Sequence, residues 1–562
     1  MGKIFILLIP IVIYTQFFIL QDHLLYGFGD VDWGFLAFYK SYKELYPNII
    51  VNFIETFKYW GVYAHQSYYI GLQGDFFGLD YKSYQITTHF FKTLAILAFY
   101  PVFVLLSGRK SIAFIATLLF SFSYTAVGTL YTTVTSSDYS AVLLLAFFLC
   151  VYILIIKKKL VGLKWILVAL ILLLITLFLS TERMYPLLFF MALLEIGLFI
   201  FHIKSKNTII EQIKRVSILF SPCLIVVLIK PMLFIDFFAR NGIELFSRIA
   251  DGDWALVLTP FTALGSIVLP NSHWNIFGLI KTESISAYLM YFLLGPWPIF
   301  IIITLIIGVG IFRKSWLFIL SVASLFSLFG WIVYILSQHR IEQFDDTYIA
   351  PALIGGYIIF VGLGSFLVWL KEKKQEYFQI FLSSFFAVIF ILLTWVASDT
   401  RLVFTGAHRY LTMPGLAIAF FLAMIIGLLT WSLWQRKDLL RFSAIIPILL
   451  LISFFIISTE QIQIFFKDQL NNGFGAYDKT LMREQVGKYV KDLPTDKPSL
   501  FLFTFQDDKK YGYYYDNTLL AGFQTWMLWH KHINFNHRLA PDLLWDQEKL
   551  LPKLVQEKNG VK

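Results

Sequence analysis

The sequence is dominated by apolar runs of about 20 residues, which follow one another from near the N-terminus to about residue 459. A helix of that length crosses the hydrocarbon core of a bilayer, and it satisfies its backbone hydrogen bonds internally, as lipid requires. Charged residues make up only 15% of the chain, against about 25% in a typical soluble domain. The sequence therefore predicts an all-α, polytopic membrane protein.

The apolar runs also give a map of the membrane spans. Phe is common, at 59 residues, as suits surfaces that face lipid. We predict about thirteen transmembrane helices, since each needs about 20 apolar residues. They are placed at 4–20, 88–106, 111–128, 139–156, 164–180, 186–203, 216–235, 287–311, 315–336, 349–370, 378–397, 411–434 and 442–459.

Basic clusters occur in every second connection of this map, and the remaining connections hold few basic residues. The basic connections contain Arg109-Lys110, Lys157–Lys159, Lys204–Arg215, Arg313-Lys314, Lys371–Lys374 and Arg436-Lys437. Because Lys and Arg favour the cytoplasmic side, we expect a multi-pass protein of the plasma (inner) membrane with a cytoplasmic N-terminus. The same clusters account for much of the formal charge of +10, so we expect no nucleic-acid partner.

Two domains follow from this topology. We predict a transmembrane domain over 1–459, with long extracytoplasmic loops at 21–87 and 236–286. Residues 460–562 form an extracytoplasmic C-terminal domain, in which a helix-like segment precedes a strand-like one. That order favours a small α/β domain.

Each long loop contains an apolar segment of its own. In the first loop, Trp33–Leu45 carries apolar residues at helical spacing with charged residues opposite, which predicts a helix lying in the membrane interface. In the second, Trp254–Pro270 is apolar but contains Pro260 and Gly265. These two residues disfavour a long straight helix, so we expect a re-entrant or interfacial element there.

The unusual ionisable residues gather at the extracytoplasmic ends of the spans and in the loops on that side. The candidates for a site are Asp30, Asp32, Asp138, Glu182, Arg183, Arg340, Arg401, His408 and Arg409. A transporter places such groups near the middle of the bilayer, whereas an enzyme acting on a lipid headgroup needs them at one interface. Carboxylates supply a base, and Arg binds two phosphate oxygens at once.

Two of these motifs allow more than one interpretation. Asp30 and Asp32 follow the first span, so either is a candidate general base, while Asp32 also suits the N-cap of the helix that follows. Arg409 and Tyr410 open the twelfth span. They suit a substrate site, but also a plain interfacial anchor.

Four short motifs resemble those of membrane glycosyltransferases of the GT-C fold. Residues 81–92 resemble the pattern "yH-x-x-N-x-x-x-H", with His89 at the second His and Gln85 in place of the first. Residues 136–138, Ser-Ser-Asp, resemble "sgRsD" without the Arg, and 180–186 resemble "sKE-x-x-x-x-lP" with Thr181 for Lys. Residues 407–414, Ala-His-Arg-Tyr-Leu-Thr-Met-Pro, resemble "aeRYLYlP" and are the best match.

The closest pattern is that of the transmembrane O-mannosyltransferases with tetratricopeptide repeats and their bacterial relatives. The motifs run in the family's order from about 20 to 435, but the C-terminal 100 residues lack the repeats, so protein mannosylation is not implied. The resemblance implies inverting transfer of a sugar from a polyprenyl-phosphate carrier, with an Asp of the first outer loop as base. Asp30 matches that position best and Asp32 is the fallback.

The same resemblance implies roles for the other candidates. Arg183, Arg340, Arg401 and Arg409 are candidates for holding the leaving lipid phosphate, and the remaining substrate-binding candidates are His89, Asp138, Glu182, His408 and Tyr410. The acceptor is unknown. A divalent cation is an open question, since Asp30, Asp32 and Asp138 have no diagnostic ligand spacing. The alternatives are an O-antigen ligase or polymerase type of enzyme and a non-catalytic transporter.

Overall fold

The computed structural model describes most of the transmembrane region and little of the C-terminal domain. The described residues are 2–25, 27–28, 30–60, 63–130, 133–180, 184–202, 206–229, 234–270, 273–274, 296–313, 315–338, 348–397, 409–436, 439–472, 543–546 and 551–554. Their regular secondary structure is helical apart from an antiparallel hairpin of β1 (Leu543–Asp546) and β2 (Leu551–Leu554). The helix and strand expected near 477–505 lie outside these residues.

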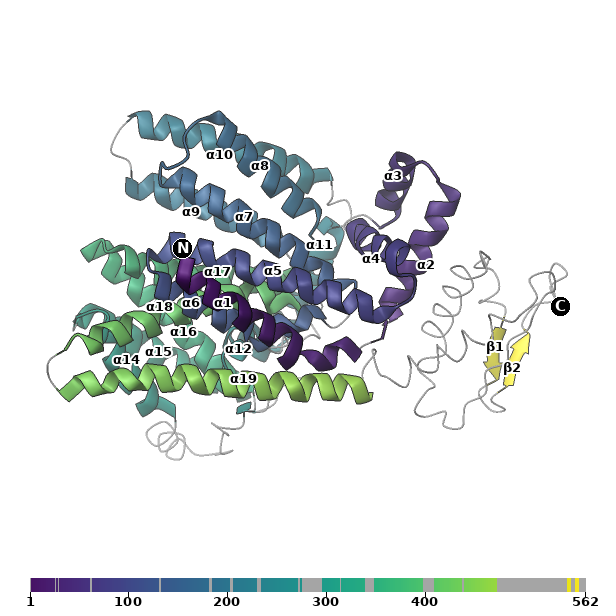
Figure 1. Ribbon diagram of the computed structural model, residues 1–562. Helices are drawn as coiled ribbons and strands as arrows, with labels where there is room; N and C mark the ends of the chain where they lie inside the picture. Colours follow the sequence, from purple (N-terminus) through teal and green to yellow (C-terminus); the bar gives the residue numbers. More distant parts are fainter. Residues whose placement is uncertain are drawn as a thin grey trace.

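Helices make up a bundle whose members run roughly side by side (Figure 1). The first half comprises α1 (Gly2–Tyr14), α5 (Tyr81–Ser107), α6 (Lys110–Ser121), α7 (Asp138–Ile156), α8 (Leu163–Phe178), α9 (Pro186–His202), α10 (Lys206–Ile229) and α11 (Phe234–Ala250). The second half comprises α12 (Thr259–Ser266), α14 (Pro296–Gly310), α15 (Trp316–Gln338), α16 (Ile349–Glu372), α17 (Gln375–Ala397), α18 (Thr412–Trp434) and α19 (Ile445–Asn472).

Seven helices of the described part are long and apolar enough to cross a membrane, and six shorter apolar helices accompany them. The protein is therefore an all-α, membrane-embedded chain. Every predicted span overlaps a helix, but several boundaries differ. Helix α5 begins at Tyr81, ahead of the predicted 88, and α19 continues to Asn472, past the predicted 459. Helix α6 ends at Ser121, seven residues before the predicted 128, and a 3-10 segment η4 (Tyr124–Leu130) follows it. Helix α10 begins at Lys206, ahead of the predicted 216.

Helix α12 is a short element pressed against a long one. Its eight residues are far fewer than a span needs, and Thr259–Ser266 is buried throughout apart from partly buried Phe261. A Cβ on Gly265 would lie 1.8 Å from the Pro351 carbonyl oxygen of α16, and one on Gly355 would lie 2.0 Å from the Phe261 carbonyl oxygen. Glycine on both sides thus allows backbone contact, and the helix is short, as its Pro and Gly predict.

Helices α2 (Asp30–Leu45), α3 (Ile49–Trp60) and α4 (Ala64–Phe77) gather beyond one end of the bundle, here called the α2 end (Figure 1). The prediction that Trp33–Leu45 turns its apolar side to the membrane is wrong. Trp33 and Leu36 are buried in a protein cluster with Ile70 of α4 and Tyr84 of α5. The exposed apolar side chains here belong to α3 instead, with Ile49 77% and Ile50 66% exposed.

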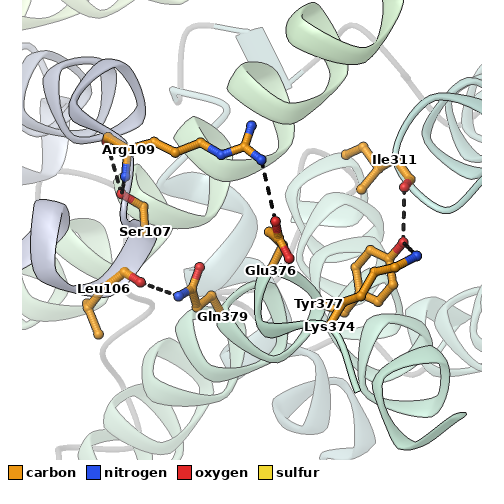
Figure 2. Close-up of polar contacts among 8 residues, drawn as sticks. All are labelled: Leu106, Ser107, Arg109, Ile311, Lys374, Glu376, Tyr377 and Gln379. Carbon is orange, nitrogen blue, oxygen red and sulfur yellow. Dashed lines mark hydrogen bonds and ion pairs between the residues drawn. The ribbon is translucent and has the colours of Figure 1, made fainter. Parts of the chain in front are cut away.

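Polar contacts join three connections at the opposite end of the bundle, here called the basic end (Figure 2). Arg109 pairs with Glu376 in the first turn of α17, with Nη2 3.4 Å from Oε1. Gln379 donates to the Leu106 carbonyl at the end of α5, and the Tyr377 hydroxyl donates to the Ile311 carbonyl over 3.3 Å. The basic connections therefore hold neighbouring helices together through polar contacts as well as carrying positive charge.

A buried ion pair ties α7, α9 and α10 together. Arg215 donates from Nε and Nη2 to the two carboxylate oxygens of Glu195, over 2.8 and 2.6 Å. The Tyr152 hydroxyl and the Gln212 amide donate to the same carboxylate, over 2.6 and 3.0 Å. The sequence analysis predicts that the unusual ionisable residues lie at the outer ends of the spans. Glu195 corrects that prediction, because it lies in the middle of the predicted span 186–203. Its charge is accommodated because Arg215 and two neutral donors surround it.

Candidate functional site

The chain between α1 and α2 brings a histidine to α5. Helix α1 passes into a π-helical turn η1 (Thr15–Ile19) and a 3-10 turn η2 (Gln21–Leu25), and π turns are frequently found at functional sites. Nδ1 of buried His23 lies 3.0 Å from Nε2 of buried His89, and Nε2 of His23 lies 2.8 Å from the Leu130 carbonyl oxygen. The two rings thereby link three segments: η2, α5 and η4.

Asp32 is fully buried in the first turn of α2, and its carboxylate holds a distant loop. Its Oδ1 accepts from the backbone N–H of Val134 over 2.7 Å, and its Oδ2 accepts from that of Thr133 over 3.2 Å. Helix α2 already begins at Asp30, so Asp32 is not the N-cap that spacing allowed. It anchors the loop that leads into α7.

The start of α5 contacts the same loop through polar side chains. The Gln85 amide donates to the Thr133 hydroxyl over 3.4 Å, and the hydroxyls of Thr88 and Ser136 are 2.9 Å apart. The 3-10 turn η5 (Thr135–Ser137) then leads directly to buried Asp138, the first residue of α7. The structure therefore brings Asp32, His89 and the segment carrying Asp138 together in one polar cluster at the α2 end.

Helix α18 begins close to this cluster. The 3-10 turn η11 (Arg409–Leu411) packs on η4, whose last residue, Leu130, accepts from His23. At Gly415, a Cβ would lie 2.2 Å from the Thr125 hydroxyl of η4. Tyr410 is half-buried in this contact region. The segment with the best family resemblance thus lies beside the cluster rather than elsewhere on the protein.

The other predicted site residues are described less fully. Asp30 and Arg409 have a described backbone, in α2 and η11, but their side chains lie outside the described part of the chain. Wholly outside it are Glu182, Arg183, Arg340, Arg401 and His408. The clustering of the predicted arginines around a lipid phosphate is therefore still a prediction.

Sequence reasoning overlooked two members of the cluster, His23 and Lys92. Lys92 lies on α5, 1% exposed, with its Nζ 5.8 Å from the centroid of the Tyr139 ring. The signal was present, since Lys92 falls inside the predicted span 88–106, where a cation is costly. His23 gave no comparable signal because its position three residues beyond the first span suits any interfacial residue.

Burial shifts the pKa values of the cluster residues that lie outside the predicted spans. Burial lowers the pKa of His23 to about 3, opposed by its hydrogen bond to Leu130 and reinforced by the charge of Lys92. Burial also raises the pKa of the Tyr69 hydroxyl of α4, which faces Ser136 and Thr88. His23 is therefore a neutral ring at physiological pH. Because a carbonyl can only accept, its Nε2 carries the proton, and its Nδ1 accepts from His89.

Comparison with protein-family models, with curated proteins and with solved structures gave no match. Among the described side chains there is also no group of three or more His, Cys, Asp or Glu arranged to hold a metal ion. What the site offers chemically thus comes from its own residues. It combines carboxylates, hydroxyls, two imidazoles and an ammonium at the α2 end of the bundle.

Proposed function

We propose that this protein is a membrane glycosyltransferase that moves a sugar from a polyprenyl-phosphate donor to a lipid, glycan or protein acceptor. One observation carries the proposal. The acidic segment that follows α1 folds directly onto the loop leading to Asp138, through the two hydrogen bonds of Asp32. A lipid-linked donor presents its sugar at a membrane interface, and this polar cluster lies at one end of the membrane bundle. The order of the motifs resembling the GT-C fold supports the same assignment.

The two acidic residues take different roles in this proposal. Both oxygens of Asp32 are already bound to backbone N–H groups, which stabilise the ionised form and weaken it as a base. Asp32 therefore positions the loop, and Asp30 is the general base that takes the proton from the acceptor hydroxyl. The acceptor oxygen then attacks the anomeric carbon from the side opposite the phosphate. The configuration inverts, and the lipid phosphate leaves with the electrons of the broken bond.

The charged leaving group needs partners of its own. Arg183, Arg340, Arg401 and Arg409 are proposed to stabilise the departing phosphate, with His89, Asp138, Glu182, His408 and Tyr410 around the substrates. Arg409 belongs to η11, which packs on η4 beside the cluster. That contact supports its inclusion.

The topology completes the proposal. Thirteen spans would place the basic end in the cytoplasm of a cell with a plasma (inner) membrane, and the α2 end outside it. A small α/β domain would then follow α19 on the extracytoplasmic side. The donor would enter from the outer leaflet, so the sugar would be transferred away from the cytoplasm.

The proposal is tested by two matched Asp→Asn variants in purified protein, with transfer of labelled sugar from a polyprenyl-phosphate donor as the readout. Loss of a general base costs about 10²–10⁴ in rate, so Asp30→Asn should lose nearly all transfer while staying folded. Asp80→Asn is the control, because Asp80 is an exposed residue at the same end whose carboxylate accepts from the Ser83 hydroxyl. Wild-type turnover in Asp30→Asn would remove it as the base.

A transporter is the second candidate, and one observation favours it. Lys92 and His89 are buried ionisable groups inside α5, which is how transporters build their pathways. Donor consumption separates the two functions, since a transporter moves its substrate across vesicles without breaking the bond between sugar and phosphate.

A further inference from the structure

Lys92 is a buried cation whose role the proposed chemistry leaves open. It is 1% exposed in α5 and forms no hydrogen bond or ion pair with any residue that the structure describes. Its contact with the face of Tyr139, at 5.8 Å, is weak beside the cost of taking an ammonium out of water. An anionic or hydrogen-bond-accepting ligand at Nζ would stabilise the charged form of Lys92.

His89 offers an unused acceptor next to this cation. It precedes Lys92 by three residues, so the two side chains share one face of α5. Its Nε2 donates to His23, which leaves Nδ1 as the acceptor nitrogen of a neutral ring. This buried Nδ1 has no hydrogen-bond partner among the described residues. A ligand that accepts from Lys92 and donates to His89 would satisfy both groups.

Lys92 lies close to the membrane boundary at which lipid headgroups sit, on its inner side. Counting about 20 residues back from Ser107, the basic end of α5, places the other membrane boundary near Thr88. Lys92 then lies roughly 6 Å inside it, at 1.5 Å per residue. Aromatic rings flank the histidines here, with Phe17 5.6 Å from His89 and Phe466 5.5 Å from His23 between centroids.

We propose that Lys92 and His89 bind the phosphate group of a membrane lipid. A monoprotonated phosphate accepts from the Lys92 ammonium through its charged oxygens and donates its P–OH to Nδ1 of His89. The lipid tail remains in the apolar surroundings of the spans. A phosphatidylglycerol headgroup could make matching contacts, with charged phosphate oxygens for Lys92 and a glycerol hydroxyl in place of the P–OH for His89. Only the choice of the polyprenyl phosphate as the natural ligand rests on the proposed function.

The test measures lipid binding to the purified full chain by native mass spectrometry and thermal shift. The probes are a polyprenyl phosphate, the uncharged polyprenol, phosphatidylglycerol and inorganic phosphate. A hydrogen bond to a charged group is worth about 1.5–3 kcal/mol, so Lys92→Met should weaken polyprenyl-phosphate binding roughly 10- to 100-fold. Lys82→Met is the control, since Lys82 is an exposed residue in the first turn of the same helix.

Lys92→Arg keeps the cation and should retain most of the binding, which separates loss of charge from misfolding. His89→Gln provides a second variant if Lys92→Met does not fold. Equal binding of polyprenol, or undiminished binding in Lys92→Met, overturns the inference, and so does a site filled by inorganic phosphate alone. Equally tight phosphatidylglycerol supports a headgroup site. Sugar transfer is scored separately, so a failure of binding with intact transfer refutes this inference and not the proposed function.

Discussion

Replacing Glu195 by Gln should lower the free energy of unfolding by about 3–5 kcal/mol, because it leaves a buried cation without its partner. Glu195 is 4% exposed and Arg215 13%. The carboxylate accepts four hydrogen bonds, from Arg215 Nε and Nη2, Tyr152 and Gln212. Gln offers one oxygen and turns an N–H₂ group toward donors, so at least one of these bonds becomes a donor–donor contact.

Three further variants separate the contributions of the hydrogen bonds, the buried charge and surface exposure to this loss of stability. Tyr152→Phe removes one neutral hydrogen bond between helices and should cost about 0.6–1.7 kcal/mol. Replacing Glu195 and Arg215 together by Met removes the pair without leaving a charge, and should recover most of the loss. Glu211→Gln is the matched control on α10, because its pair with Lys158 is 3.8 Å long and about two-thirds exposed, which is worth at most about 1 kcal/mol.

The assay is reversible unfolding of the purified protein in detergent, followed by helix content and by a tertiary probe. Glu195→Gln should fall well below Glu211→Gln in stability, and the double Met variant should lie between Glu195→Gln and the wild type or above it. Equal effects of Glu195→Gln and Glu211→Gln would contradict the reasoning, since the buried network would then contribute no more than an exposed pair.

Two further predictions concern packing and pH. Gly265→Val should lower the free energy of unfolding by several kcal/mol, because the Cβ of the new side chain would lie 1.8 Å from the Pro351 carbonyl oxygen. The control in thermal unfolding is Gly252→Ala, which has open space around its Cβ but a φ of +113°, so it measures backbone strain without a clash. The pKa of His23 falls from 6.5 to about 3 on folding, so between these values the unfolded chain binds the extra proton. Stability should be full above pH 6.5 and decline toward pH 3, by up to about 5 kcal/mol at 1.36 kcal/mol per unit, and His23→Gln should flatten that slope in a pH series of unfolding measurements.

The helices were largely predictable because the sequence pattern and the physical requirement agree. Lipid forces each apolar run to be helical, so α5, α7 and α16–α18 begin and end within a few residues of the predicted spans, apart from the seven residues by which α5 begins earlier. The Pro and Gly of 254–270 likewise indicated a non-spanning element. The sequence pattern does not show whether lipid or protein covers an apolar face. The apolar face of α2 was therefore predicted to contact the membrane, although Trp33 and Leu36 contact protein.

The sequence predicted which residues belong to the candidate site better than it predicted how those residues contact one another. Asp32, His89 and Asp138 were singled out from separate motifs, and the structure brings their segments together. The anchoring role of Asp32 depends on two backbone N–H groups about a hundred residues away. Because every residue type except proline has a backbone N–H, the sequence does not reveal such partners. Lys92 and Glu195 each give a signal as a single charge in an apolar run, but the sequence pattern does not show which residue lies opposite either of them.

The most direct test of the central claim follows one labelled donor with the purified wild-type protein and a panel of lipid, glycan and peptide acceptors. The account predicts that the sugar leaves the polyprenyl phosphate and appears on an acceptor with inverted anomeric configuration, determined by NMR. Retained configuration would contradict the single-displacement chemistry assigned to Asp30. A folded wild-type protein that consumes no donor, yet carries it intact across vesicles, would contradict the glycosyltransferase assignment itself.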